Sequence, residues 1–226
     1  MAKTKLEHFA DMKTMDCVFE PLLETLQNDE FPMKGNWSKD FFKNDNPIIV
    51  ELGCGKGEYT VGLAKKYPNH NYIGIDVKGA RIWYGADAVR SLELDNAAFV
   101  RIRIDFLKAI FAENEIDQIW LTFSDPQKEK PRKRLTSKMF MDRFKHVLKP
   151  GGIVHLKTDS DILFESTEEQ IAEHNYKCEN TTWDLYSTEY WDKLSEEEQS
   201  ILGIKTVYEK LFTEKGSVIK YCQIQL

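Results

Sequence analysis

Short β-branched runs alternate with longer amphipathic stretches along the chain from Pro47 onward. Several short runs are apolar almost throughout, as expected for strands buried on both faces of a parallel sheet. Five strands are predicted on this basis, at residues 48–52, 71–75, 98–104, 118–123 and 152–157. The stretches between them have helical spacing, with Pro68, Pro150 and the Gly151–Gly152 pair as stops. These predicted helices cover residues 58–67, 78–94, 106–114, 137–148 and 161–174.

The pattern changes on both sides of this region. After about Tyr176 come scattered aromatic residues, a charged stretch at 195–199 and a last alternating run at 217–226. They predict two closing antiparallel strands with a loop and a short helix between them. The first 46 residues lack a long periodic element. We therefore expect an N-terminal arm over residues 1–46, packed on a single α/β domain over residues 47–226.

Composition narrows the class of protein. The 226 residues are 42% apolar and 30% charged, which suits one globular domain with a substantial core. No apolar run approaches the roughly 20 residues of a bilayer span, and the N-terminus lacks the apolar core of a signal peptide, so we expect a cytoplasmic protein without membrane association. Four scattered cysteines and unclustered histidines predict reduced thiols and no metal site. The net charge of −6 restricts any nucleic-acid site to a local patch.

Residues 51–57, ELGCGKG, follow the first predicted strand directly and open the first predicted helix. The chain must turn tightly there, at the edge of the sheet where ligands bind in such folds. Without side chains, Gly53, Gly55 and Gly57 let a ligand approach the backbone, and amides at the helix start can receive polar or anionic groups. A tight loop with a purely structural role is the alternative explanation.

The glycine spacing separates two classes of nucleotide site. Nicotinamide and flavin enzymes place a pyrophosphate over GxGxxG, whereas here the glycines run GxGxG and follow the acidic Glu51. A carboxylate is unfavourable beside a pyrophosphate and favourable beside the ammonium group of a bound amino acid. The loop therefore favours a nucleoside cofactor that carries an amino acid.

Carboxylates also stand at the ends of the next two predicted strands. Asp76, about 20 residues after the loop, is placed to accept hydrogen bonds from two vicinal ribose hydroxyls. Asp105 is placed to accept one from an adenine amino group. Each aspartate alone is also a common helix N-cap. Three acidic residues at three consecutive strand ends nevertheless favour a site for an adenosine.

The fourth predicted strand runs into FSDP at residues 123–126, where Pro126 favours an extended backbone at Asp125. The Asp125 carboxylate is then expected to project from the sheet edge beside the glycine loop, in a position for catalysis. Residues 128–134, KEKPRKR, follow with five basic residues in seven. A solvated charged loop is the alternative explanation, and the position next to Asp125 weighs against it.

The ordered set of motifs resembles the bacterial tRNA (guanine-N7)-methyltransferases from about Pro47 to the C-terminus. The set comprises ELGCGKG, GID at 74–76, Asp105, FSDP with a basic stretch ending KRL at 133–135, LKTD at 156–159 and TVYE at 206–209. The first two occur in many methyltransferases, while the DP-basic segment and the late TxYE point to this family. The resemblance implies a Rossmann-like methyltransferase fold with a mostly parallel central sheet, helices on both faces and an antiparallel C-terminal strand.

The resemblance also implies a role for each matching residue. S-adenosylmethionine, whose product is S-adenosylhomocysteine, would be bound by Glu51, Gly53, Gly55, Gly57, Asp76, Asp105 and Asp125, the last also being catalytic. The guanosine would be bound by Lys128, Glu129, Lys130, Asp159, Thr206, Val207, Tyr208 and Glu209. The tRNA backbone would be bound by Arg132, Lys133 and Arg134. Family members often have Trp and Lys where this chain has Gln127 and Glu129, so Lys128 and Lys130 are candidate replacements for that lysine.

Guanine N7 carries a lone pair and no proton, so methyl transfer to it needs no general base, and positioning should dominate. Positive charge reaches the imidazole ring of guanine as the methyl arrives, and a fixed carboxylate is attracted to it most strongly in the transition state. We expect Asp125 to have this role, while Asp159 and Glu209 accept hydrogen bonds from N1 and N2 of guanine.

Several alternatives stay open at the level of sequence. They are a methyltransferase for another RNA position or for a small-molecule amine, a cofactor-free RNA-binding protein, and a dehydrogenase. The family resemblance places the modified guanosine in the variable loop of tRNA. A monomer and a homodimer are both compatible with the sequence.

Overall fold

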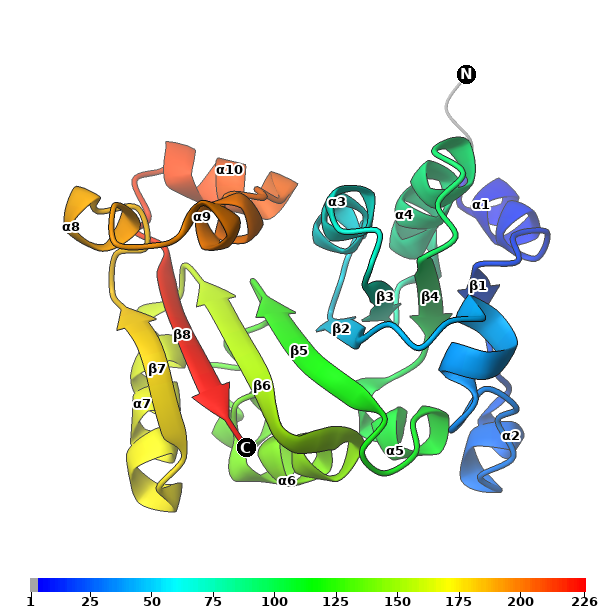
Figure 1. Cartoon of the computed structure of the whole chain (residues 1–226), viewed down its shortest axis with the longest axis horizontal. Coiled ribbons are helices and arrows are strands. Elements are labelled where there is room, and N and C mark those ends of the chain that lie inside the picture. The colour runs from blue at the N-terminus through cyan, green and yellow to red at the C-terminus, as the bar shows by residue number, and fades with distance from the viewer. Residues whose placement is uncertain (1–3) are drawn as a thin grey trace.

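The computed structural model describes residues 4–226, and its framework is an eight-stranded sheet (Figure 1). The strands lie in the order β1-β4-β3-β2-β5-β6-β8-β7. They are β1 (Val18–Phe19), β2 (Ile48–Leu52), β3 (Asn71–Asp76), β4 (Ala97–Arg101), β5 (Ile116–Thr122), β6 (Leu148–Thr158), β7 (Lys177–Thr182) and β8 (Lys220–Gln225). The first six pair in parallel, and β8 runs antiparallel to β6 and β7. This arrangement confirms the predicted fold class.

Helices cover both faces of the sheet. They are α1 (Lys5–Met12), α2 (Leu23–Gln27), α3 (Glu58–Lys66), α4 (Gly79–Ser91), α5 (Leu107–Ile110), α6 (Lys138–Val147), α7 (Asp161–His174), α8 (Thr188–Trp191), α9 (Glu196–Leu202) and α10 (Val207–Glu214). A π-helix spans Trp37–Phe42, and 3-10 helices span Ile104–Phe106 and Pro131–Lys133. None of the described helices is both long and apolar enough to cross a membrane.

Side chains of the central strand β2 contribute to two apolar layers, one on each face of the sheet. Val50 and Leu52 belong to an apolar cluster that also contains residues of α5, α6 and α7, while Ile49 belongs to a second cluster with residues of α3 and α4. Figure 1 shows α3 and α4 above the strands and α5 and α6 below them. Because both faces are covered, β2 is buried along its whole length, which explains its unbroken apolar sequence.

The strand order places a ligand site at the end of β2. β3 lies on one side of β2 and β5 on the other, so the connections leaving the centre of the sheet run in opposite directions. The loops that follow such a reversal point away from each other and leave a crevice at the carboxyl ends of the strands. The loops after β2 and β5, which carry the predicted cofactor and catalytic motifs, flank this position.

The segment before Pro47 contributes to the sheet as well as covering it. Val18 and Phe19 pair in parallel with β4. Trp37 is fully buried, and its indole Nε1 donates to the carbonyl of Ile110 at 3.0 Å. The elements of this segment are at most eight residues long, which is too short for a recognisable periodic pattern.

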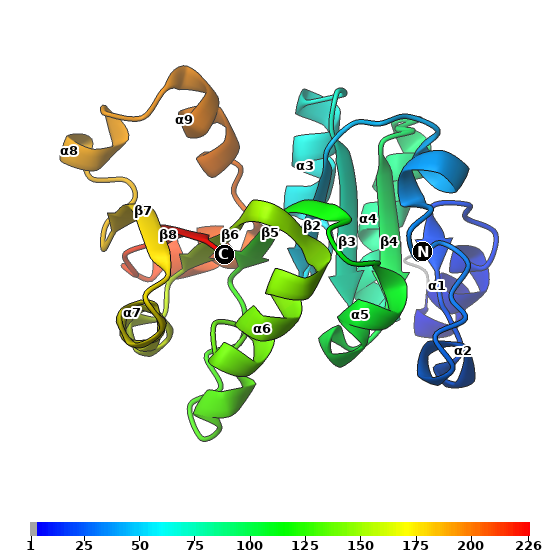
Figure 2. The same cartoon turned by 60° about the horizontal axis from the view of Figure 1, so that its bottom comes forward.

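Several predicted bounds differ from the structure; the helix predicted at 106–114, for example, is the shorter α5. β4 ends at Arg101 rather than at residue 104, because its pairing with β3 stops at Asp76 and the chain then turns into a 3-10 helix. Between the antiparallel strands β7 and β8, three short helices stand where one was predicted. We call residues 183–219 the helical insertion. Figure 2 shows its helices α8 and α9 at the opposite end of the molecule from α1 and α2.

Candidate active site

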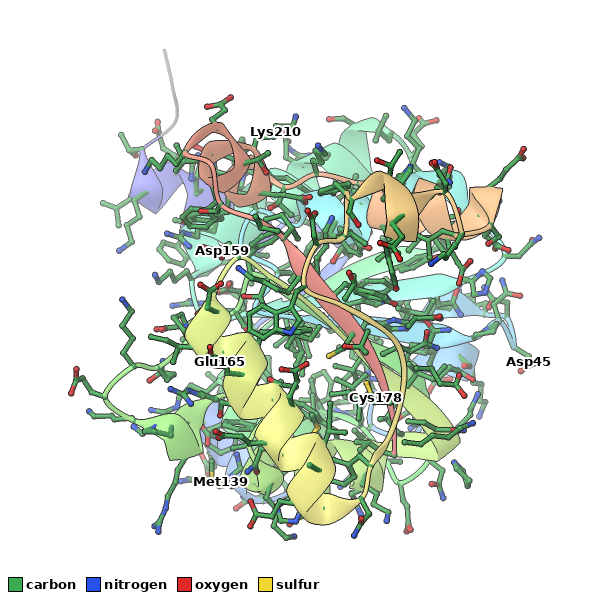
Figure 3. All side chains as sticks on the ribbon, turned by 90° about the vertical axis from the view of Figure 1, so that its left-hand side faces the viewer. Asp45, Met139, Asp159, Glu165, Cys178 and Lys210 are labelled. Atoms are coloured by element: carbon green, nitrogen blue, oxygen red, sulfur yellow. The ribbon has the colours of Figure 1, made fainter. Side chains whose placement is uncertain are left out.

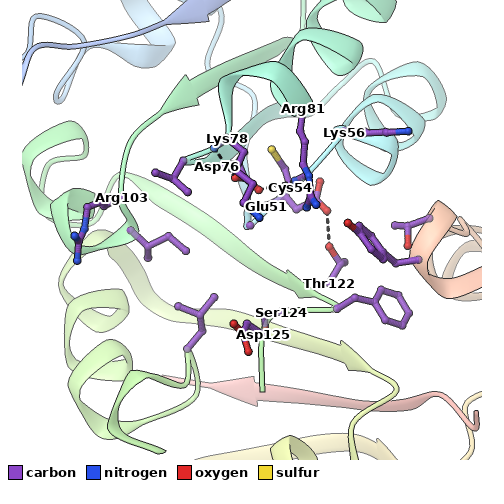
Figure 4. A pocket seen from close by; sticks show the side chains of 18 of the residues that line it. Glu51, Cys54, Lys56, Asp76, Lys78, Arg81, Arg103, Thr122, Ser124 and Asp125 are labelled. Atoms are coloured by element: carbon purple, nitrogen blue, oxygen red, sulfur yellow. Dashed lines mark hydrogen bonds between the residues drawn. The ribbon is translucent and has the colours of Figure 1, made fainter. Parts of the chain in front are cut away.

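A pocket of ≈ 700 Å³ opens at the carboxyl edge of the sheet (Figure 4). Its walls come from the segments after β2, β3, β4 and β5, from the starts of α4 and α6, and from α10. The predicted site residues that line it are Glu51, Gly53, Gly55, Asp76, Asp105, Asp125, Lys133, Thr206 and Tyr208. Those outside its lining are Gly57, Lys128, Glu129, Lys130, Arg132, Arg134, Asp159, Val207 and Glu209. The volume suits a nucleoside-sized ligand.

Glycine is required at position 57 of the loop for a different reason than at position 55. Gly57 has φ +71°, and a Cβ there would lie 2.6 Å from the ring of Phe99, so the site demands glycine for both backbone and packing. Gly55 has φ +58°, but nothing lies within 4 Å of its missing Cβ. The space beside Gly55 therefore belongs to the pocket and is free for a ligand.

Glu51 lies at the bottom of the pocket, almost fully buried. One carboxylate oxygen accepts from the backbone N–H of Thr60 at 3.0 Å and from its hydroxyl, and the other accepts from the hydroxyl of Thr122. Burial raises the pKa of Glu51 to about 7, although these hydrogen bonds oppose the rise. The side chain is therefore held in one orientation and lacks a cationic partner among the described residues.

Asp76 ends β3 and closes the turn into α4. Its carboxylate accepts from the backbone N–H of Gly55 at 2.9 Å and from that of Lys78 at 2.8 Å. It therefore ties the glycine loop to the next strand end. Each carboxylate oxygen keeps a further lone pair for a ligand.

Asp105 lies in the 3-10 helix after β4, at the pocket wall. It forms ion pairs with Arg103 at 3.2 Å and Arg143 at 3.1 Å. Partial burial raises its pKa, but the hydrogen bonds from the two arginines outweigh that effect and hold the pKa below its usual value. Asp105 is thus a fixed, ionised acceptor.

Asp125 is held by the residue two positions further along the chain. Its two carboxylate oxygens accept from the backbone N–H and from the side-chain Nε2 of Gln127, both at 2.9 Å. Gln127 has φ +46°, and Phe123, which begins the FSDP motif, has φ +51°. The turn therefore presents an exposed, oriented carboxylate at the pocket, in the position that the sequence predicts.

Ser124 is a pocket residue that the sequence reasoning missed. Its side chain lines the pocket between Thr122 and Asp125 (Figure 4). Its Oγ is buried and has no hydrogen-bond partner among the described residues. Such an atom costs about 1–3 kcal/mol when left unpaired, so it marks a place for a polar ligand atom.

The basic segment divides into exposed and buried residues. Lys128, Lys130 and Arg132 are exposed, and the exposed Lys133 reaches the pocket lining. Arg134 is buried, with its Nε donating to the carbonyl of Pro126 at 2.9 Å. Arg134 therefore fixes the loop that carries Asp125, whereas the other cations are free to meet an anionic partner.

The C-terminal motif lies at the start of α10. Thr206 is the N-cap of this helix and accepts from the backbone N–H of Glu209 at 3.1 Å. Tyr208 lines the pocket, while Val207 is exposed and its N–H donates to Glu58 at 3.2 Å. The Glu209 side chain is fully buried beneath the helix. The motif is therefore divided between the pocket and the interior.

Asp159 stands apart from the pocket, between β6 and α7 (Figure 3). Its backbone carbonyl accepts from Lys220 Nζ at 2.9 Å. Partial burial raises the pKa of its carboxyl above the usual value.

Three aromatic side chains, which we call the aromatic wall, line the pocket: Tyr208, a predicted site residue, and Phe123 and Phe212, which were not predicted. The rings of Tyr208 and Phe212 are 6.2 Å apart, and those of Phe212 and Phe123 are 6.3 Å apart. The Arg81 guanidinium lies over the Tyr208 ring at 5.5 Å. Tyr208 and Phe212 are four residues apart on one helix face, a signal that is readable only once α10 is recognised.

Known proteins define the family. A model of a family described as putative methyltransferases matches residues 45–222. A tRNA (guanine-N(7)-)-methyltransferase of Bacteroides fragilis is 48% identical over 226 residues, which are 100% of this chain and 87% of that protein. One of Streptococcus gordonii is 37% identical over 188 residues, which are 82% of this chain and 84% of that protein. The chain belongs to the tRNA (guanine-N(7)-)-methyltransferase family.

Solved structures share the fold of this tRNA (guanine-N(7)-)-methyltransferase family member at low identity. The 16S rRNA methyltransferase KamB aligns with a TM-score of 0.60 at 13% identity, covering 83% of this chain and 90% of that one. A 30S ribosomal A1408 methyltransferase from an uncultured bacterium aligns with a TM-score of 0.58 at 13% identity, covering 84% and 92%. They confirm the predicted methyltransferase fold. The described residues contain no group of three or more His, Cys, Asp or Glu side chains placed to bind a metal ion.

Proposed function

We propose that this protein transfers a methyl group from S-adenosylmethionine to N7 of a guanosine in tRNA, in the cytoplasm. The observation that carries the proposal is the convergence of Glu51, Asp76 and Asp125 on one pocket, in a chain whose 48% identical relative is named a tRNA (guanine-N(7)-)-methyltransferase.

The pocket fits S-adenosylmethionine on three independent observations. Its volume is ≈ 700 Å³, the space beside Gly53 and Gly55 is open, and the buried Ser124 hydroxyl lacks a partner in the part of the chain that the structure describes. Glu51 would bind the ammonium group, Asp76 the ribose hydroxyls and Asp105 the adenine amino group. When bound, the cofactor supplies a methyl group already activated on a sulfonium.

The acceptor side needs a fixed negative charge more than it needs a base. Guanine N7 uses its own lone pair to form the new bond, so no proton has to leave before transfer. The Asp125 carboxylate, oriented by Gln127, would stabilise the positive charge that the guanine ring acquires. The aromatic wall of Phe123, Tyr208 and Phe212 provides surfaces on which a flipped-out base can stack.

Replacing Ser124 with alanine is expected to weaken S-adenosylhomocysteine binding about fivefold, the effect of losing one hydrogen bond worth about 1 kcal/mol. Because the hydroxyl has no partner among residues 4–226, the melting temperature of the free protein should stay the same or rise slightly. Calorimetric titration and thermal unfolding measure the two effects. An unchanged affinity would show that the ligand leaves Ser124 unpaired.

Charge reversal of the exposed pair Arg132 and Lys133 to glutamate is expected to raise KM for tRNA about tenfold at low salt. The difference should shrink as salt rises, because phosphate contacts depend on counterion release. The matched control reverses Lys65 and Lys66, which are exposed at the far end of α3. If the affinity for tRNA changes neither with salt nor with charge reversal at Arg132 and Lys133, these residues do not bind tRNA.

The proposed function is tested by incubating the protein with tritiated S-adenosylmethionine and unmodified bulk tRNA, followed by nucleoside analysis. Label in 7-methylguanosine is the expected result. Label in another nucleoside, or none, would rule out the named reaction. Calorimetry with S-adenosylhomocysteine then distinguishes a methyltransferase with another acceptor, which binds it, from an RNA-binding protein without a cofactor, which does not.

A further inference from the structure

A buried ion pair joins the central sheet to the helical insertion. Lys157 Nζ on β6 lies 2.9 Å from Glu209 Oε2 on α10, and both side chains are fully buried. The same ammonium donates to the carbonyls of Leu202 at 2.6 Å and Ile204 at 3.2 Å. Tyr186 donates its hydroxyl to the other carboxylate oxygen of Glu209. The three N–H groups of Lys157 therefore all have acceptors.

Helix α10 depends on this pair because little else buries it. Glu209 is its one buried residue among Val207–Glu214, and the large apolar side chains Val207 and Leu211 are 51% and 41% exposed. Most helices of globular proteins are held by an apolar stripe on the core. Here a charged side chain occupies the inward position instead.

The pair also lies close to two walls of the pocket, the end of β5 and helix α10. Lys157 is the register partner of Thr122 on β5, and its carbonyl accepts from the backbone N–H of Phe123 at 2.8 Å. Thr122 in turn donates to Glu51. On the other side, Glu209 directly follows the pocket residue Tyr208. A displacement of the pair would therefore move the aromatic wall relative to the strand end that carries the catalytic motif.

We propose that the Lys157–Glu209 ion pair is a positioning device that sets α10, and with it Thr206 and Tyr208, against the substrate side of the pocket. Glu209 then acts through Lys157 rather than by touching guanine, and both are positioning residues. The inference rests on the proposed function, since it concerns the acceptor side of the same pocket. A buried ion pair has little advantage in stability over an apolar pair. An apolar replacement of both residues can therefore keep α10 in place while removing the Glu209 carboxylate, which separates a positioning role from direct contact with guanine.

The test is a double-mutant cycle of Lys157→Met, Glu209→Leu and the double variant. Each single variant leaves a buried group unpaired and should lower kcat/KM for tRNA about 30-fold, mainly through KM, with S-adenosylhomocysteine affinity within about twofold of wild type. The double variant should recover to within about fivefold of wild type. Tyr186 can then donate to the carbonyl of Leu202, 3.3 Å away.

Hydrogen exchange of the amides at residues 207–214 reports the position of α10 without using activity. Exchange should be faster in each single variant and return towards wild type in the double variant. Glu209→Gln, which keeps the shape and removes the charge, should show the same changes more weakly and serves if a single variant does not fold. Glu214→Gln, exposed at the end of the same helix, is the control and should match wild type.

Two results would overturn the inference. One is a double variant that folds and binds S-adenosylhomocysteine normally but stays as inactive as Glu209→Leu, because Glu209 would then act on the substrate itself. The other is a normal KM and normal exchange in Lys157→Met. If wild-type protein makes no 7-methylguanosine, the proposed function fails, while hydrogen exchange still shows whether the pair positions α10.

Discussion

Replacing Asp125 with asparagine is expected to lower kcat for tRNA methylation about 100-fold or more, with S-adenosylhomocysteine affinity close to that of wild type. The two carboxylate oxygens are held by Gln127 at 2.9 Å, so the charge is fixed at the place where the proposed mechanism puts the guanine ring. Asparagine keeps the size and one acceptor oxygen, so the turn should persist. Initial rates of 7-methylguanosine formation at saturating cofactor and tRNA measure the effect.

The matched control for Asp125 is Asp142→Asn on α6. Asp142 is 56% exposed and pairs with Lys138 on the surface, so its loss should leave kcat unchanged. Near-normal turnover of Asp125→Asn with unchanged cofactor binding would show that the electrostatic role is wrong. Loss of cofactor affinity without loss of kcat would make Asp125 a binding residue instead.

The raised pKa of Glu51 predicts that a proton is released when a ligand binds in the pocket. Burial raises the pKa of Glu51 to about 7 in the free protein, and an ammonium placed beside it would favour the ionised form and lower that pKa. S-adenosylhomocysteine binding should therefore release close to one proton at about pH 6 and strengthen as pH rises towards 7. Calorimetry in two buffers with different ionisation enthalpies counts the protons.

The Glu51→Gln variant separates binding from stability. Its affinity for S-adenosylhomocysteine should fall about 100-fold, and the proton release should disappear. The raised pKa also means that the free wild-type protein loses stability as pH rises from the usual 4.5 to about 7. The variant should lack this loss and be the more stable protein above pH 7. A proton release unchanged in Glu51→Gln, with Glu214→Gln as control, would assign it to another group.

The sheet and its main helices were predictable because burial on both faces leaves a strong pattern. The predicted bounds of β2 and α7 match the structure at both ends. Helix α10 was missed, although Thr206 followed three residues later by Glu209 is a recognised helix-start signature. In the family resemblance, the same four residues indicate only a binding motif. In the structure Thr206 does cap the helix, by accepting from the N–H of Glu209.

The partners of the candidate site residues were less predictable, because they come from distant parts of the chain. Asp105 pairs with Arg143, 38 positions away, and Glu209 pairs with Lys157, 52 positions away. A lysine in a strand and a glutamate in a polar segment give no sign of burial by themselves. The basic run likewise does not reveal that Arg134 turns inward to Pro126.

The helical insertion leaves and rejoins the sheet at neighbouring positions. Thr182, the last residue of β7, is the register partner of Tyr221 on β8, so the strand residues on either side of the segment lie about 5 Å apart. A segment anchored in this way can gain or lose residues without shifting the pairing of any strand. The α10 side of the pocket can therefore change without moving the glycine loop after β2, so exchange of residues 183–219 offers a way to alter that side of the pocket alone.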